Sequence, residues 1–404
     1  MDKLRAKYGA GGLLHCGQGK WYPGEQLPRW SLNLYWRRDR TPLWTHPELL
    51  ADEHKNYGVT EQHAQQFLHS VAARLGLPSK FVFAVFEDSW YHLWREGKLP
   101  TNVDPFDAKL ADPLERDRLR KLFEQGLDKA VGHVLPLARE EAREPGAAAR
   151  WRSGPWFLRG PRCYLIPGDS ALGYRLPLDS QPWAKDSDLP WVHPVDQTQS
   201  FAPLPGYRSL RWQPPAVVAD ASTELVKAAA PTRVPARGES AGWVARTALS
   251  AEPRGGRLYI FMPPAAKLED YLELVAAVED TAVEMKLPVI LEGYEPPKDP
   301  RLAVLRVTPD PGVIEVNIHP ANSWTDLVDQ TTHLYQSAFE TRLSTEKFML
   351  DGRHTGPGGR WGHRASTACR CRTRRGGCCP TRRSAGCAAA GRSTTAGSGR
   401  PLGW

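Results

Sequence analysis

Three polar side chains in one short stretch have the chemistry to bind a cation or a phosphate group. Residues 311–320 have the sequence PGVIEVNIHP, which alternates apolar and polar side chains. Side chains alternate between the two faces of a strand, so Glu315, Asn317 and His319 are predicted to share one face. Same-face neighbours lie roughly 6 to 7 Å apart, close enough to share a ligand. The alternative is a half-exposed strand whose polar face only meets water.

A second segment combines glycines with a lysine. Residues 17–25 have the sequence GQGKWYPGE. The backbone N–H groups of Gly17 and Gly19 and the ammonium of Lys20 are groups that can bind phosphate. The spacing of a complete P-loop is absent, so the segment indicates a phosphate site only weakly.

The positive net charge belongs to one end of the chain. The 404 residues carry a formal charge of +8, but ten of the 53 lysines and arginines lie in residues 360–404, where there is no aspartate or glutamate. The remaining body has 43 basic and 45 acidic residues. A nearly neutral body argues against nucleic acid as a partner.

Residues 360–404 also differ in composition from everything before them. They lack Val, Ile, Phe, Tyr and Met and contain five of the seven cysteines. Such a segment cannot bury enough apolar surface to offset the entropy of ordering it, so it is predicted to be disordered. An out-of-frame translation of GC-rich DNA is one explanation and a genuine basic tail is the other. A zinc site is a third alternative, although the cysteine spacing matches no paired C-x-x-C pattern.

No apolar run is long enough to span a bilayer, and no apolar segment follows the first five residues. The protein is therefore expected to be cytoplasmic, without a membrane as a partner.

Hydrophobic periodicity predicts the elements that must position these residues. Helices are expected over residues 60–76, 112–131, 268–287 and 323–342, and strands over residues 29–37, 80–88, 163–166, 257–262, 288–291, 303–307 and 314–318. Strands joined mostly by short turns, with helices inserted singly, favour an α+β fold over a doubly wound parallel sheet. A first part (1–180) and a third part (254–359) are expected to build one domain, separated by a Pro- and Ala-rich insertion or linker (181–253) and followed by the tail (360–404).

Four segments together resemble a known family. They are GQGKWYPGE at residues 17–25, PGDS with GYRLPLDS at 167–180, PDPGVIEVNIHP at 309–320 and TEKFMLDGRHTG at 345–356. In this order they resemble the bacterial amidoligase domain found as the C-terminal half of large transglutaminase-like proteins. That family is grouped with carboxylate–amine ligases related to glutamate–cysteine ligase and glutamine synthetase.

The resemblance implies a glutamine synthetase-like fold, a curved antiparallel sheet that holds ATP and Mg²⁺. It implies phosphorylation of a carboxylate by ATP and attack of an amine on the acyl phosphate, with small-molecule or peptide carboxylates and amines as substrates. The expected metal ligands are Glu315, Glu25 and Glu292, and the expected cofactor-binding residues are Lys20, Gly17, Gly19 and Asn317. The expected catalytic residues, near the phosphate or neutralising its charge, are His319, Arg353, His354 and Arg175.

The chain departs from the family pattern after residue 359 and begins without the transglutaminase-like part. A truncated and catalytically inactive member is therefore one alternative, with a transglutaminase-like domain or protein as an expected partner. A cysteine-dependent transglutaminase or hydrolase using Cys16 is another. His15 is a poor base for Cys16, because adjacent residues of a strand point to opposite faces.

Overall fold

A computed structural model describes most of the chain. The described residues are 1–19, 29–88, 128–140, 150–158, 160, 162–167, 174–189, 200–206, 209, 232–310, 313–344, 346–348, 354–357 and 366–371. All structural statements below concern these residues. The predicted helix over residues 112–131 lies almost wholly outside them.

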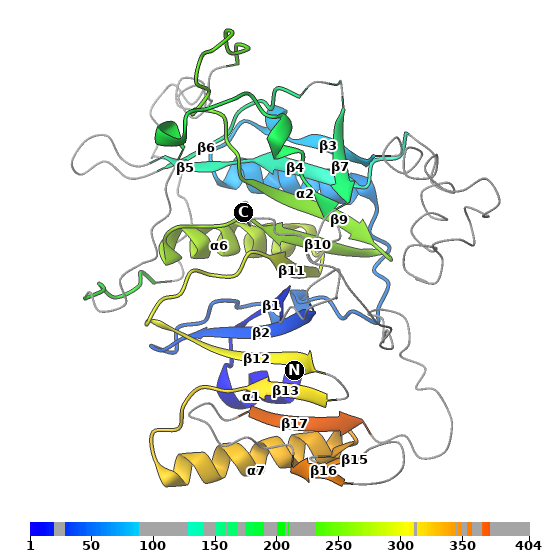
Figure 1. Ribbon diagram of the computed structural model, residues 1–404, viewed down its shortest axis with the longest axis vertical. Coiled ribbons are helices and arrows are strands. Elements are labelled where there is room, and N and C mark those ends of the chain that lie inside the picture. The colour runs from blue at the N-terminus through cyan, green and yellow to red at the C-terminus, as the bar shows by residue number, and fades with distance from the viewer. Residues whose placement is uncertain are drawn as a thin grey trace, which may run out of the picture.

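One 13-stranded sheet organises the molecule, and its strands follow one another along the long axis (Figure 1). The strand order is β14-β17-β13-β12-β2-β1-β11-β10-β9-β4-β3-β7-β8. The strands from the first part of the chain are β1 (Leu13–Gln18), β2 (Trp30–Arg37), β3 (Phe83–Glu87), β4 (Gly132–Pro136), β7 (Cys163–Pro167) and β8 (Tyr174–Arg175). Those from the later part are β9 (Ala248–Arg254), β10 (Arg257–Met262), β11 (Val289–Gly293), β12 (Leu302–Asp310), β13 (Val313–Asn317), β14 (Leu343–Ser344) and β17 (Ser366–Cys371).

Most neighbouring strands are antiparallel. Only the pairs β1–β11, β10–β11 and β3–β7 run parallel among the described strands. Two small hairpins, β5 (Ala138–Glu140) with β6 (Arg150–Arg152) and β15 (Glu346–Phe348) with β16 (His354–Pro357), stand apart from the sheet. A mixed fold with a large, mostly antiparallel sheet is thereby confirmed.

The described helices are α1 (Asp2–Tyr8), α2 (Glu61–Arg74), α6 (Leu268–Met285) and α7 (Trp324–Glu340). Their starts follow from local capping. Ser323 accepts a hydrogen bond from the backbone N–H of Asp326, and Thr60 and His63 form a reciprocal capping box at the start of α2. None of these helices is long and apolar enough to cross a membrane.

The main apolar core lies between α2, α6 and one face of the central strands. Phe67 of α2 and Tyr271 of α6 are fully buried there against Leu258, Ile260 and Leu291. The buried side of α6 carries an apolar side chain every three to four residues, including Leu268, Tyr271, Leu272, Val275 and Val278.

Two smaller apolar clusters lie on the opposite face of the sheet. Near one end, Leu34, Leu305 and Val316 pack with Leu4 and Tyr8 of α1. Toward the other end, the cluster formed by Val85, Val134, Cys163, Leu165 and Ala248 has Trp156 and Leu158 packed against it.

Two strands lie in segments that were predicted to be a linker and a disordered tail. The predicted linker over residues 181–253 includes most of β9, which lies between β4 and β10 in the middle of the sheet. Within the tail predicted over residues 360–404, Ser366–Cys371 form β17 and pair with β13 and β14. Backbone hydrogen bonds to an open strand edge need no apolar side chains, so composition does not exclude such pairing.

Candidate active site

Strand register fixes which side chains share a face of the sheet. Glu292 is paired with Cys16, Cys16 with Leu32, Leu32 with Val307 and Val307 with Val316. Residues paired in register point to the same face. The side chain of Glu292 therefore lies on the face opposite to α2 and α6, whereas Glu315, the neighbour of Val316, projects from the other face.

An acid–arginine cluster occupies the Glu292 face over β9, β10 and β11. It consists of Glu252, Arg254, Tyr259 and Glu292. Arg254 donates a hydrogen bond of 2.5 Å from Nη2 to Oε2 of Glu292, and its Nε lies 3.5 Å from Oε2 of Glu252. The guanidinium also stacks 3.6 Å above the centre of the Tyr259 ring. One arginine thus bridges two carboxylates from separate strands.

A two-residue hairpin positions this arginine. Arg254 and Arg257 flank Gly255 and Gly256, both of which have positive φ (56° and 74°), as a type I′ turn requires. The carbonyl of Gly256 also accepts hydrogen bonds from Tyr57 and Val59. The turn is therefore anchored to the loop before α2.

The two carboxyl groups differ in their electrostatic surroundings. Burial, together with the charges of Glu292 and Glu87, raises the pKa of Glu252 to about 7, against the lowering effect of Arg254. Burial also raises the pKa of Glu292, while its ion pair with Arg254 lowers it. A carboxyl group with a pKa near neutrality can give or take a proton at physiological pH.

The cluster offers an incomplete set of metal ligands. Within the described part of the chain, no group of three Asp, Glu, His or Cys side chains surrounds a metal position. Oε1 of Glu292 is nevertheless buried without a hydrogen-bond partner. A buried carboxylate oxygen without a donor fits a cation, and Mg²⁺ commonly takes one or two carboxylates and completes its shell with substrate phosphates and water.

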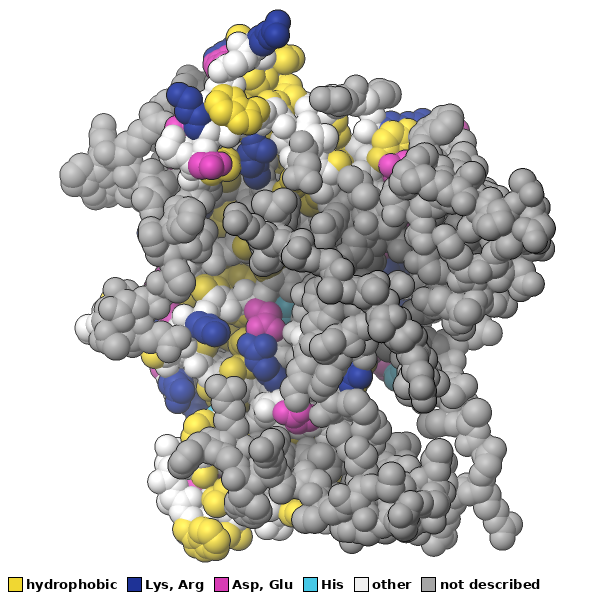
Figure 2. Space-filling model, in the orientation of Figure 1, with side chains coloured by type: hydrophobic (Ala, Val, Ile, Leu, Met, Phe, Trp, Pro, Cys, Tyr) yellow, Lys and Arg dark blue, Asp and Glu magenta, His cyan; other side chains and the backbone are white. Residues whose placement is uncertain are grey.

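A second polar network lies on the opposite face, where Figure 2 shows acidic and basic side chains next to each other below the position of α6. Glu295 accepts hydrogen bonds from both terminal nitrogens of Arg306, at 2.9 and 2.6 Å, and from Nδ2 of Asn33 at 2.9 Å. Ser31 donates to Oδ1 of Asn33. A Cβ on Gly17 would lie 2.8 Å from Asn33 Nδ2, so glycine is needed there for this packing. The network is closed on itself and is best explained as structural.

His15 lies beside this second network, on the same face of the sheet, without a hydrogen bond to it. Its ring is buried, contacts Tyr35 edge-on and has no hydrogen-bond partner for either nitrogen by standard geometry. Burial lowers the pKa of His15 to about 4, although Glu295 and nearby backbone carbonyls act in the opposite direction. The imidazole is therefore neutral at pH 7.

The three residues that first suggested a site do not converge. Glu315 and Asn317 are paired with Thr308 and Arg306 in β12 and lie on the face of the second network. His319 lies after the end of β13, and its ring contacts Tyr8 and Trp36 on the other face. The prediction of one shared face is wrong for His319, because the alternation ends when the chain leaves the strand. Glu315 and Glu292 likewise lie on opposite faces and cannot share a metal.

The other predicted site residues are only partly described. Lys20, Glu25 and Arg353 lie outside the described residues, and Arg175 and His354 are described only as backbone positions in β8 and β16. Gly17 packs against Asn33 of the second network. Gly19 follows β1, and its N–H donates a hydrogen bond to the carbonyl of Arg29.

The side chain of Cys16 lies on the same face of the sheet as Glu292, with which it is paired in register. Burial and the charges of Glu292 and Glu53 raise the pKa of Cys16 to about 12, which leaves almost no thiolate at pH 7. Its neighbour His15 projects from the opposite face. The geometry of a cysteine–histidine pair is therefore absent at these two residues.

Sequence reasoning missed Glu252 and Arg254. Glu252 falls in the segment predicted to be a Pro- and Ala-rich linker (181–253), and Arg254 is the first residue of the part predicted to follow it (254–359). The usable signal was local: two consecutive glycines at 255 and 256 separate two runs with strand character, a pattern typical of a two-residue hairpin.

A comparison with known families finds a match over most of the chain. The family model described as "Putative amidoligase enzyme (DUF2126)" matches residues 1–364. No curated protein and no solved structure matches the chain.

Proposed function

Because this chain belongs to the amidoligase family that matches residues 1–364, we propose that it is an ATP-dependent ligase that joins a carboxylate to an amine through an acyl phosphate. The observation that supports the proposal most is the acid–arginine cluster on the face opposite to α2 and α6. It combines a buried carboxylate oxygen without a partner, a guanidinium and a carboxyl group whose pKa is about 7.

The proposed reaction has two steps. An oxygen of the substrate carboxylate attacks the terminal phosphorus of ATP, and ADP leaves. The amine nitrogen then attacks the carbonyl carbon of the acyl phosphate, the C–O bond to phosphate breaks, and an amide forms. The amine must lose a proton during the second step.

Each member of the cluster has a proposed role. Arg254 neutralises negative charge on the transferred phosphoryl group, as arginine does at other phosphoryl-transfer sites. The carboxylate of Glu252 accepts the proton of the attacking amine, since a base with a pKa near the working pH is the most effective. Glu292 would hold Mg²⁺, and the cation would supply charge neutralisation at the phosphates of ATP.

The proposal includes four further properties that are expected from the sequence. They are the glutamine synthetase-like curvature of the sheet, a cytoplasmic location, an incomplete C-terminal part and a transglutaminase-like domain or protein as partner. A truncated, inactive member of the family is the competing proposal, and the experiment below separates it from an active ligase.

Trapping the acyl phosphate tests the proposal without knowledge of the amine. The protein is incubated with Mg²⁺, ATP, hydroxylamine and a panel of amino acids and short peptides as carboxylates. Hydroxamate formation and phosphate release are then measured. Both are expected to require Mg²⁺ and ATP together and to persist in Cys16→Ala. If neither hydroxamate nor phosphate forms in any of the mixtures, the result would favour the inactive alternative.

Substitutions on the two faces locate the site. Glu292→Gln is expected to reduce hydroxamate formation by about 100-fold or more, which is typical of the loss of a group that stabilises transition-state charge. Glu252→Gln is expected to slow ligation of ordinary amines by about 10²- to 10⁴-fold. It should spare the hydroxamate reaction, because hydroxylamine is largely unprotonated at neutral pH.

Glu315→Gln is the matched comparison, a glutamate replaced by glutamine on the opposite face. A loss confined to Glu315→Gln would place the metal there and overturn the assignment to Glu292. Circular dichroism of each variant separates loss of function from loss of structure.

A further inference from the structure

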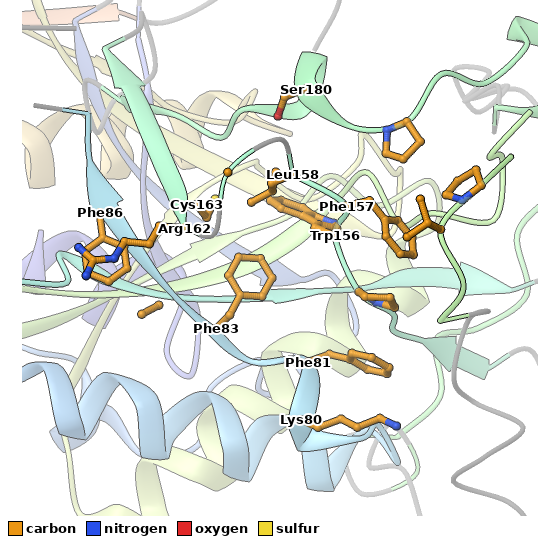
Figure 3. Close-up of a pocket in the computed structure, with 16 residues that line it drawn as sticks. Lys80, Phe81, Phe83, Phe86, Trp156, Phe157, Leu158, Arg162, Cys163 and Ser180 are labelled. Carbon is orange, nitrogen blue, oxygen red and sulfur yellow. The ribbon is translucent and has the colours of Figure 1, made fainter. Parts of the chain in front are cut away.

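A pocket lined with aromatic side chains lies near the β3–β7 end of the sheet (Figure 3). Its volume is about 800 Å³, which is in the range of small-molecule sites. The apolar wall is built by Phe81, Phe83, Phe86, Trp156, Phe157 and Leu158. Trp156 is held in place by a 2.7 Å hydrogen bond from its indole nitrogen to the carbonyl of Ala245.

Much of the pocket shares a sheet face with Glu252. Cys163, which lines the pocket, is paired with Val85, and Val85 is paired with Gly132. Gly132 lies beside Glu252, as the neighbouring pair His133 and Ala251 requires. Two strand spacings separate β3 from β9, so with the offset along the strands Phe83 lies roughly 10 to 15 Å from Glu252.

Gly132 contributes no side chain between the pocket and the cluster, and it is itself buried. A Cβ there would lie 2.6 Å from the carbonyl oxygen of Ala251 and 3.3 Å from Cα of Glu252. The strands therefore require glycine at this position. The surface between Val85 and Glu252 consequently carries no side chain from β4.

Two cations border the aromatic wall. Arg162 lies 4.8 Å from the centre of the Phe86 ring and is paired with Asp128. Lys80 is exposed, lies 5.2 Å from the centre of the Phe81 ring and has no carboxylate partner among the described residues. A ligand that joins an aromatic ring to an anionic group complements this border.

We propose that the pocket binds the amine substrate and that this substrate is a short peptide with a C-terminal aromatic residue. The aromatic ring enters the pocket, the terminal carboxylate binds Lys80, and the N-terminal amine is directed along the sheet toward Glu252. A span of 10 to 15 Å corresponds to about three or four extended residues. The substrate assignment rests on the proposed ligase function, whereas binding of the peptide does not.

Calorimetry without ATP tests the binding, with glycylglycylphenylalanine as the probe. It is expected to bind about tenfold or more tightly than glycylglycylalanine, because the ring is removed from water. Lys80→Met should weaken binding about two- to fivefold, as expected for an exposed ion pair, and Lys80→Arg should restore it. The C-terminal amide of the probe should bind equally to the wild type and Lys80→Met.

Filling the pocket gives a second test. A Cβ at Gly160 meets nothing within 4 Å, so Gly160→Phe can be introduced without a clash at Cβ. Gly160→Phe should weaken binding of the probe about tenfold, and Gly160→Ala is the control that leaves it within twofold. Equal binding of the two tripeptides, or no effect of Gly160→Phe, would overturn the assignment of the pocket.

The two proposals fail in different ways. Peptide binding that depends on Lys80 and Gly160, without hydroxamate formation or phosphate release, would remove the ligase and leave the peptide site. ATP- and Mg²⁺-dependent hydroxamate formation without such binding would remove the peptide site and leave the ligase. With both present, the probe should be joined to a carboxylate at a rate that Glu252→Gln lowers without changing the affinity for the probe.

Discussion

Two ionisable residues on opposite faces of the sheet are predicted to give the stability of the protein opposite dependences on pH. The pKa of Glu252 is about 7 in the folded protein and 4.5 ordinarily, so between these values the folded form binds more protons and stability falls as pH rises. The pKa of His15 is about 4 when folded and 6.5 ordinarily. Between those values the folded form binds fewer protons, and stability is lost as pH falls.

The two effects oppose each other between pH 4.5 and 6.5, so single substitutions should reveal them. Each can contribute at most about 1.4 kcal/mol per pH unit. In Glu252→Gln the free energy of unfolding should rise more steeply with pH than in the wild type, and in His15→Gln it should rise less steeply or fall. Urea unfolding at several pH values measures both slopes. Slopes that change in the same direction in the two variants would show that at least one assignment is wrong.

At the scale of elements, the β9–β10 hairpin has the clearest consequence for the site. Its turn fixes Arg254 beside Glu292, although the two residues are 38 positions apart in the chain. Gly256 has a φ of 74°, and a Cβ there would lie 1.7 Å from Oδ1 of Asn56. Both the backbone conformation and the space around the turn therefore require glycine.

Gly256→Ala is expected to lower the free energy of unfolding by about 2 to 4 kcal/mol, the sum of strain at positive φ and a steric clash. Gly238→Ala is the matched control, because Gly238 has a similar φ of 78° but nothing within 4 Å of its Cβ. It should cost only the backbone part, about 1 kcal/mol. Denaturant unfolding compares them, and equal losses would mean that the contact with Asn56 is unimportant.

Helix α7 has apolar side chains of two kinds, some buried and some exposed to solvent. Trp324 and Phe339 are both 76 % exposed, while Leu334 and Ala338 are buried. The periodicity of the sequence predicts the helix correctly. The periodicity does not indicate which apolar side chains of α7 are buried against the rest of the chain.

At the scale of the whole molecule, one continuous sheet connects apolar clusters on its two faces. Phe67 belongs to the core under α2 and α6, and Leu305 belongs to the cluster with α1, and both are fully buried. Because β12, β2, β1 and β11 are hydrogen-bonded neighbours, the clusters should unfold together.

Truncation of either side chain is therefore expected to shift the same thermal transition. Phe67→Ala should cost about 3 to 5 kcal/mol and Leu305→Ala about 2 to 5 kcal/mol. Calorimetry with circular dichroism as a second probe measures the transition. A variant in which one transition moves while another stays in place would show that the two clusters are separate cooperative units.

The local elements could be predicted from the order of the residues alone. Strands such as β2 and β10 and helices such as α2 and α6 follow from alternation, three-to-four periodicity and caps, which are interactions between residues close in the chain. The same local patterns indicated a mostly antiparallel α+β protein, and four motifs indicated the family. Composition changes near residue 360, but it does not indicate the pairing of β17 with β13.

Which polar residues contact one another depends on how distant segments of the chain pack together. Asn33 and Glu295 are 262 positions apart and bond to each other, whereas Glu315 and His319, four positions apart, lie on opposite faces of the sheet. Strand order and register are set by long-range hydrogen bonds and by burial on both faces, which a local pattern does not contain. The acid–arginine cluster depends on such long-range pairing. It forms because β9, most of which was assigned to the linker, pairs with β10, and β10 pairs with β11.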